Sequence, residues 1–123
     1  MIIIDYSDKR PIYEQIVERF RTLILNGALE PDEKLPSVRN LAIDLSINPN
    51  TIQKAYAELE RMGFVYVVKG RGNFVCSDIK VLQLEKEKLL TEFRGDLKRL
   101  REIGITEAEL VGCIKEVYKE ANV

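Results

Sequence analysis

The side chains best suited to chemistry lie in the stretch NPNTIQKAY, residues 48–56. Its polar members are the amides of Asn50 and Gln53, the hydroxyl of Thr51 and the ammonium group of Lys54. Asn and Gln can form paired hydrogen bonds with adenine, Thr can contact a phosphate or a thymine methyl, and Lys can bind guanine or phosphate. These residue types therefore favour contacts with DNA bases over catalysis.

A helix is needed to turn these polar side chains to one side. Asn48 is typical of a helix N-cap, and Pro49 suits the first helical position because proline lacks an N–H group. The apolar residues that follow recur at helical spacing: Ile52, Ala55, Tyr56, Leu59 and Met62. We expect a helix over residues 48–63 whose apolar side packs on the domain and whose polar side contacts DNA.

Two further helices are predicted before this one. The first starts at Pro11 and ends near Gly27. The second is short and lies in LPSVRNLAIDL, with Ser37 as its N-cap. Its first amides and the Ser37 hydroxyl suit a backbone phosphate, and Arg39, one turn further on, would reach a phosphate or a base.

A β-hairpin is predicted after the helix over 48–63. Two β-branched and aromatic runs, FVYVV and NFVC, are joined by Lys69-Gly70-Arg71-Gly72. We expect Lys69, Arg71 and Gly72 at the hairpin tip to clamp the minor groove or the DNA backbone. The order of helix, short helix, turn, helix and hairpin predicts a winged helix-turn-helix.

The pattern changes after Asp78 to a long amphipathic helix that stops at Gly104, followed by a last helix with the capping box Thr106–Glu109. Two helices have too few layers to enclose a core, so their apolar faces need a partner, either the winged domain or a second copy of the chain. The candidate dimerisation residues are Leu89, Phe93, Leu97, Leu100, Leu110, Ile114, Val117 and Tyr118.

The fold class that we expect is α+β, mainly α. Residues 1–78 would form the winged helix-turn-helix DNA-binding domain, and residues 79–123 would form a two-helix C-terminal dimerisation tail.

The charge is distributed unevenly along the chain. The net charge is −1 overall, but residues 1–33 carry −3, residues 34–76 carry +3 and residues 77–123 carry −1. Because salt limits the reach of each charge to about 8–10 Å, the local sign matters more than the total. The middle third is therefore the part suited to phosphates.

Composition argues against several other functions. The chain has no histidine, no evident pair of catalytic carboxylates and only two cysteines, Cys76 and Cys113, with no activating base. We therefore expect neither an enzyme, nor a metal site, nor a cofactor. The opening MIII is too short for a signal peptide or a membrane span, which favours a cytoplasmic protein with reduced thiols and no membrane partner.

The ordered set of motifs resembles the GntR family of bacterial transcription regulators. The resemblance runs from RPIYEQIVERFRTLILNGAL through KLPSVRNLAIDLSINPNTIQKAYAELERMGF to GRGNFV, about residues 9–76. The short tail, including REIGITEAEL, is similar to the YtrA-like subfamily, which lacks the large effector-binding domain of most members and uses the tail chiefly for dimerisation.

This resemblance implies a homodimer that binds a pseudo-palindromic operator and usually represses, often at operons with ABC transporter genes. It also implies DNA contacts from the matching positions: Arg39, Asn50, Thr51, Gln53, and the wing tip around Arg71 and Gly72. Many relatives have a basic residue where this chain has Pro49, which leaves open which bases are contacted. The alternative function is a winged-helix module that binds an acidic protein partner, and the sequence specifies no small-molecule effector.

Overall fold

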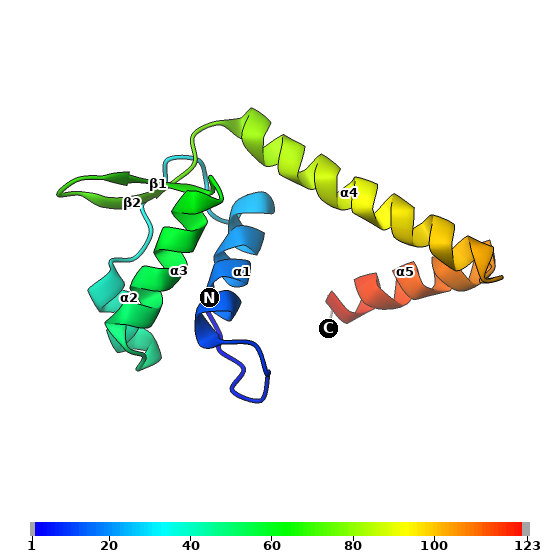
Figure 1. Ribbon diagram of the computed structural model, residues 1–123, viewed down its shortest axis with the longest axis horizontal. Coiled ribbons are helices and arrows are strands. Elements are labelled where there is room, and N and C mark those ends of the chain that lie inside the picture. Colours follow the sequence, from blue (N-terminus) through cyan, green and yellow to red (C-terminus); the bar gives the residue numbers. More distant parts are fainter. Residues whose placement is uncertain (1, 122–123) are drawn as a thin grey trace. The chain divides into compact units, whose positions relative to one another are not determined.

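The computed structural model describes residues 2–121, so the outer ends of the two predicted domains, residue 1 and residues 122–123, lie outside the described residues. Contacts divide the chain into two compact units, Met1–Leu84 and Glu85–Val123. The elements in Figure 1 are α1 (Ile12–Leu25), α2 (Val38–Leu45), α3 (Pro49–Arg61), β1 (Val65–Val68), β2 (Gly72–Val75), α4 (Ile79–Glu102) and α5 (Glu107–Ala121). The predicted fold class, mainly helical with a small sheet, is confirmed.

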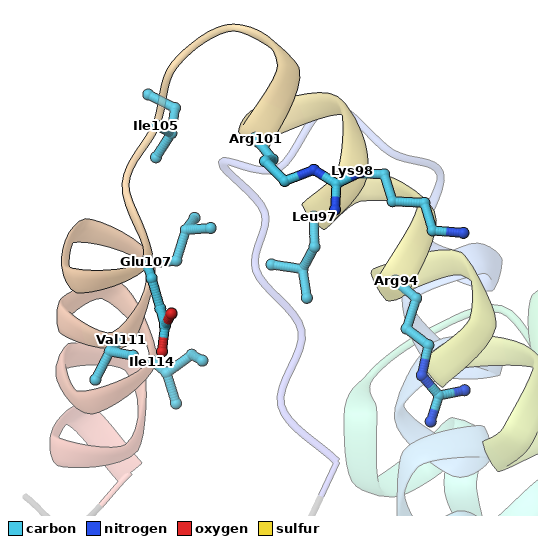
Figure 2. Close-up of a pocket in the computed structure, with 9 residues that line it drawn as sticks. Arg94, Leu97, Lys98, Arg101, Ile105, Glu107, Val111 and Ile114 are labelled. Carbon is cyan, nitrogen blue, oxygen red and sulfur yellow. The ribbon is translucent and has the colours of Figure 1, made fainter.

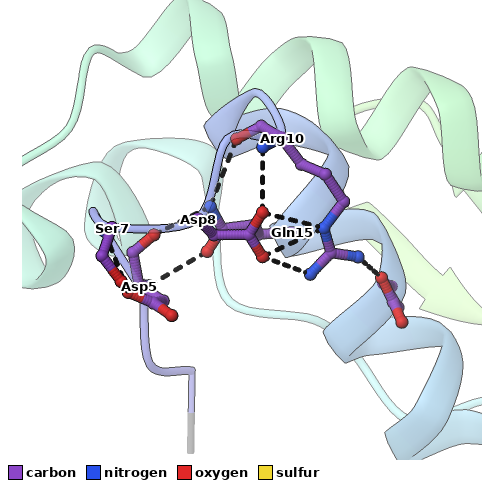
Figure 3. Close-up of polar contacts among 6 residues, drawn as sticks. Asp5, Ser7, Asp8, Arg10 and Gln15 are labelled. Carbon is purple, nitrogen blue, oxygen red and sulfur yellow. Dashed lines mark hydrogen bonds and ion pairs between the residues drawn. The ribbon is translucent and has the colours of Figure 1, made fainter.

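The N-terminal segment is fixed to α1 by the buried side chain of Gln15. Its Oε1 accepts a hydrogen bond from the Asp5 N–H at 3.0 Å, and its Nε2 donates to the carbonyl oxygens of Asp5 at 3.0 Å and Arg10 at 3.3 Å (Figure 3). The Arg10 guanidinium also bonds to the carboxylates of Asp8 and Glu18. Its hydrogen bond lowers the pKa of the Asp8 carboxyl. The segment before α1 is thus held by specific polar contacts.

The core of the first unit is built around α3, against which α1 and α2 pack. The largest fully buried side chains are Tyr56, Phe20, Phe64, Ile16, Ile52, Leu59 and Val75. The Phe20 and Tyr56 rings meet edge to face, with centroids 5.6 Å apart and planes at 81°. The Tyr56 hydroxyl donates a hydrogen bond to the Pro36 carbonyl oxygen at 2.7 Å, and burial raises the pKa of this hydroxyl. Tyr56 therefore links α1, α3 and the loop that leads into α2.

Both predicted caps of the helix-turn-helix are confirmed. The Ser37 Oγ accepts a hydrogen bond from the Asn40 N–H at 3.0 Å at the start of α2. The Asn48 Oδ1 accepts one from the Asn50 N–H at 2.8 Å at the start of α3. Between the two helices, Ser46 has a left-handed backbone with φ of 54°. This residue ends α2 and allows the tight turn.

The hairpin is confirmed, and it gains a neighbour that the sequence did not predict. Strands β1 and β2 pair antiparallel. On the other edge of β2, residues 32–35 form a short bridge: the Leu35 N–H donates to the Asn73 carbonyl oxygen at 2.9 Å, and the Val75 N–H donates to the Glu33 carbonyl oxygen at 2.8 Å. The sequence predicted only a loop here, because charged residues and flanking prolines obscure the strand signal.

Helix α4 begins in the first unit. Leu82 is buried and belongs to the same core as α1 and α3. The contact division at Leu84 therefore falls a few residues later than the boundary between residues 78 and 79 that the sequence pattern suggests.

The second unit contains the rest of α4, a turn and α5. Gly104 has φ of 91°, which allows the chain to reverse. The predicted capping box is confirmed: the Glu109 N–H donates to Thr106 Oγ1 at 3.2 Å, and the Thr106 N–H donates to Glu109 Oε2 at 3.4 Å. Within the described residues, α5 has no buried side chain. This unit thus leaves much of its apolar surface in solvent.

None of the helices within residues 2–121 combines the length and the apolar character needed to cross a bilayer.

The role of Tyr56 gives a test of the fold. We expect Tyr56→Phe to lower the free energy of unfolding by about 0.5–1.5 kcal/mol, because the ring is kept but the bond to the Pro36 carbonyl is lost. Urea unfolding measures this change. Tyr6→Phe is the control, since the Tyr6 side chain is 70% exposed and its hydroxyl loses only solvent contacts. An equal effect of the two substitutions would contradict the linking role of Tyr56.

Candidate nucleic-acid interface

The first half of α3 presents polar side chains to solvent. Asn50, Gln53 and Lys54 are exposed, and Thr51 is half-buried. On the opposite side, Ile52 is fully buried. The helix is therefore amphipathic in the sense that the sequence predicted, and the four candidate residues lie within its first six positions.

The side-chain amides of Asn50 and Gln53 are available for recognition. Within residues 2–121, neither side-chain amide has a hydrogen-bond partner. The cap of α3 is the side chain of Asn48, which bonds to the backbone N–H of Asn50 and leaves the Asn50 side chain unused. Each amide offers a donor and an acceptor side by side, the arrangement that pairs with adenine in the major groove.

Lys54 differs from its neighbours because its side chain reaches toward α1. The Lys54 Nζ lies 3.9 Å from the centre of the Tyr13 ring. Beside this pair is an open cavity of about 440 Å³ between the starts of α1 and α3. It is lined by Pro11, Ile12, Tyr13, Asn48, Asn50, Thr51 and Lys54. No sequence pattern indicates Tyr13 as a functional residue, because its contact with Lys54 depends on the packing of α1 on α3.

The start of α2 offers a second set of donors. Ser37 and Arg39 are both exposed. Within the described residues, the backbone N–H groups of Val38 and Arg39 have no acceptor, because the Ser37 cap satisfies only the N–H of Asn40. Free amides at the positive end of a helix dipole favour an anion.

The hairpin tip carries two cations on a glycine-rich turn. Lys69 and Arg71 are both exposed, and Gly72 is half-buried. Gly70 and Gly72 have φ of 78° and 123°. The second value is accessible in practice only to glycine, so Gly72 is needed for the shape of the turn.

The base of the hairpin is braced by Tyr66. Its ring stacks on Phe74 of the paired strand, with centroids 5.6 Å apart. Its hydroxyl donates to Asp32 Oδ1 at 2.7 Å, a bond that raises the pKa of Tyr66. The hairpin is therefore held from both strands and from the bridge before α2.

Lys34 is a candidate that the sequence prediction omitted. A Cβ atom on Gly72 would lie 3.1 Å from the Lys34 Cε, so the lysine side chain runs alongside the hairpin tip. This proximity arises from the bridge between residues 32–35 and β2. The basic character of the segment was visible in the sequence, but its pairing partner was not.

The cations at the start of α2 and at the hairpin tip form no ion pair within the described part of the chain. Within residues 2–121, no acidic group lies at ion-pair distance from Arg39, Lys69 or Arg71. In contrast, Arg61 bonds to Glu58 through Nε at 2.9 Å, and Arg99 bonds to Asp96. Unpaired cations are available to displace the counterions of DNA phosphates.

The candidate dimerisation residues lie on α4 and α5. Five are exposed: Leu89, Phe93, Ile114, Val117 and Tyr118. Three are half-buried: Leu97, Leu100 and Leu110. Leu97 and Ile114 extend into the space between the helices, where an open cavity of about 490 Å³ has a largely apolar floor (Figure 2). The two helices thus line one open cavity and do not close a core between them.

Comparison with known proteins relates the chain to bacterial regulators. The family described as "Bacterial regulatory proteins, gntR family" matches residues 12–75. The HTH-type transcriptional repressor YtrA of Bacillus subtilis (strain 168) is 40% identical, over 99% of this chain and 95% of YtrA.

Two solved structures extend this comparison. A GntR family transcriptional regulator from Listeria monocytogenes is 37% identical, with a TM-score of 0.74 over 90% of this chain and 98% of that chain. The AraR(DBD) in complex with operator ORE1 is 30% identical, with a TM-score of 0.53 over 62% of this chain and 93% of that chain. YtrA and the Listeria protein are transcriptional regulators and not enzymes.

The two glycines of the hairpin tip give a matched pair of substitutions. We expect Gly72→Ala to lower the free energy of unfolding by about 1–3 kcal/mol, because its φ of 123° strains any side chain and the new methyl group displaces Lys34. Gly70→Ala should cost about 1 kcal/mol, since φ of 78° is close to the left-handed helical region and no atom lies within 4 Å of the added Cβ. Urea unfolding compares the two. A larger cost for Gly70→Ala would contradict this account of the turn.

Proposed function

The chain belongs to the GntR family of bacterial regulatory proteins, and on that premise we propose that it represses transcription by binding a pseudo-palindromic operator as a homodimer. It is a DNA-binding transcription regulator. One observation carries the proposal: the side-chain amides of Asn50 and Gln53 at the start of α3 have no partner within residues 2–121, and they lie in the same unit as the unpaired cations Arg39, Lys69 and Arg71. Side chains of this kind can contact base edges while the cations bind phosphates.

The candidate residues divide into two roles. Asn50 and Gln53 contact base edges when the start of α3 enters the major groove. The phosphate contacts come from α3 as well as from the start of α2 and the hairpin tip, with Thr51 and Arg39 at positions that reach either a phosphate or a base. The remaining phosphate contacts of this proposal are Ser37, Lys54, Lys69, Arg71 and Gly72, where the glycine contributes its backbone.

In this proposal the two-helix tail forms the dimer interface. The two-helix unit exposes Phe93, Ile114 and Val117, and burying these side chains against a second copy would lower the free energy of the pair. The similarity to YtrA extends into this tail, since it covers 99% of this chain and 95% of YtrA. Twofold pairing also matches the symmetry of a pseudo-palindrome.

The proposed division of labour assigns DNA binding to residues 1–78 and dimerisation to residues 79–123. Two copies would place their α3 helices in major grooves about 34–36 Å apart, one turn of the duplex. Binding there would exclude polymerase from an overlapping promoter. A role on chromosomal DNA places the protein in the cytoplasm.

Two substitutions distinguish base recognition from phosphate binding. After operators are selected from random duplexes, we expect Gln53→Ala to relax discrimination at one base pair by about 1–3 kcal/mol. Arg71→Ala should weaken binding to all sequences and reduce the salt slope by about one unit. Fluorescence anisotropy at several salt concentrations measures both.

The same measurements can also contradict the proposal, in two ways. An unchanged selected motif with Gln53→Ala would refute direct base recognition by that residue. A wild-type chain that retained no duplex at low salt would instead favour the acidic protein partner.

The dimer is tested at α5. We expect Ile114→Lys to shift the protein to a monomer and to weaken operator binding, because a charge would be buried in an apolar interface. Sedimentation velocity gives the mass, and circular dichroism verifies that the helices persist. Glu116→Lys introduces a lysine at an exposed polar position of the same helix and should leave the mass unchanged. A wild-type protein that sediments as a monomer at micromolar concentration would refute the proposal.

A further inference from the structure

We propose that Tyr13 of α1 is a positioning residue for DNA binding, which holds the ammonium group of Lys54 where it binds a backbone phosphate and not a base. This inference rests on the proposed function and adds α1 to the interface. Its starting point is the distance of 3.9 Å between the Lys54 Nζ and the centre of the Tyr13 ring. A cation within about 6 Å of a ring face is attracted by the electron-rich centre of the ring.

The placement of Lys54 favours a phosphate. Contact with a base would require the side chain to extend straight outward from α3 into the groove, as Asn50 and Gln53 are free to do. The Tyr13 ring instead keeps the ammonium group beside α1, at the cavity between the starts of the two helices. The other polar side chains lining that cavity include Thr51, which can also donate to a phosphate oxygen.

An aromatic ring holds a cation without neutralising its charge, whereas a carboxylate would neutralise it. The acidic groups near Tyr13 have other partners: Glu14 accepts a hydrogen bond from the Tyr13 hydroxyl at 3.3 Å, and Glu58 accepts one from Arg61 at 2.9 Å. Within residues 2–121, no carboxylate lies at ion-pair distance from Lys54. The full positive charge is therefore oriented and still available to an anion.

The inference assigns different roles to adjacent residues of α3. Gln53 would determine which sequence is bound, whereas Lys54 would add affinity for every sequence. Tyr13 would act only through Lys54, by reducing the conformational freedom that the lysine loses on binding.

The test is a double-mutant cycle on DNA binding. The variants are Tyr13→Phe, Tyr13→Leu, Lys54→Met and the Tyr13→Leu/Lys54→Met pair, with an operator duplex and a scrambled duplex as probes between about 50 and 200 mM salt. Lys54→Met should reduce the salt slope by about 0.9 and weaken binding to both duplexes by the same factor. Tyr13→Leu should weaken binding about two- to fivefold, and Tyr13→Phe less than twofold because the ring face remains.

The coupling between the two sites decides the positioning role. Tyr13→Leu should have no further effect on DNA affinity when Lys54→Met is already present. A loss of the same size in that background would show that Tyr13 acts on the fold and would overturn the proposal. Thermal unfolding of each variant is recorded as a check. Should Tyr13→Leu fail to fold, Lys54→Met still decides between phosphate and base, because Lys54 is exposed and outside the core.

Two other results would contradict the inference. A change in the preferred base at one position with Lys54→Met would make this residue a base contact. A wild-type protein that binds no duplex would refute the proposed function as well, whereas normal wild-type binding with unaffected variants would refute only the role of the Tyr13–Lys54 pair.

Discussion

The first unit depends on the burial of one side chain, Tyr56. Its ring packs edge to face on Phe20 of α1, and its hydroxyl bonds to the Pro36 carbonyl just before α2. Together with the buried Ile52 and Leu59, Tyr56 therefore fixes the position of α3 accurately relative to both neighbouring helices. Recognition of DNA needs this accuracy, because hydrogen bonds to base edges tolerate errors of only a few tenths of an ångström.

The proposed interface combines two kinds of side chain with different demands. The amides of Asn50 and Gln53 must be free of internal partners, and the cations on α2 and the hairpin must be free of carboxylates. Both conditions hold within the described residues, while acidic groups elsewhere on the surface bond to Arg10, Arg61 and Arg99. The net charge of the chain, −1, conceals this separation.

Local signals explain what the sequence could predict. The caps at Ser37 and Asn48, the hairpin turn and the Thr106–Glu109 box each depend on residues within a few positions of one another. The bridge of residues 32–35 to β2, which brings Lys34 to Gly72, depends on a partner far along the chain. The contact of Lys54 with Tyr13 likewise follows from the packing of two helices, so neither carried a signal in the pattern. The DNA-binding and dimerisation residues themselves stay predictions.

The cap of α3 has a consequence for how such proteins diverge. Asn48 caps the helix and Tyr56 anchors it, and within residues 2–121 the side-chain amides of Asn50 and Gln53 form no internal hydrogen bond. A gene duplicate can therefore exchange either codon without endangering its own folding. New operator preferences become reachable by single nucleotide changes, and families of paralogues can occupy separate promoters in one genome while keeping one scaffold.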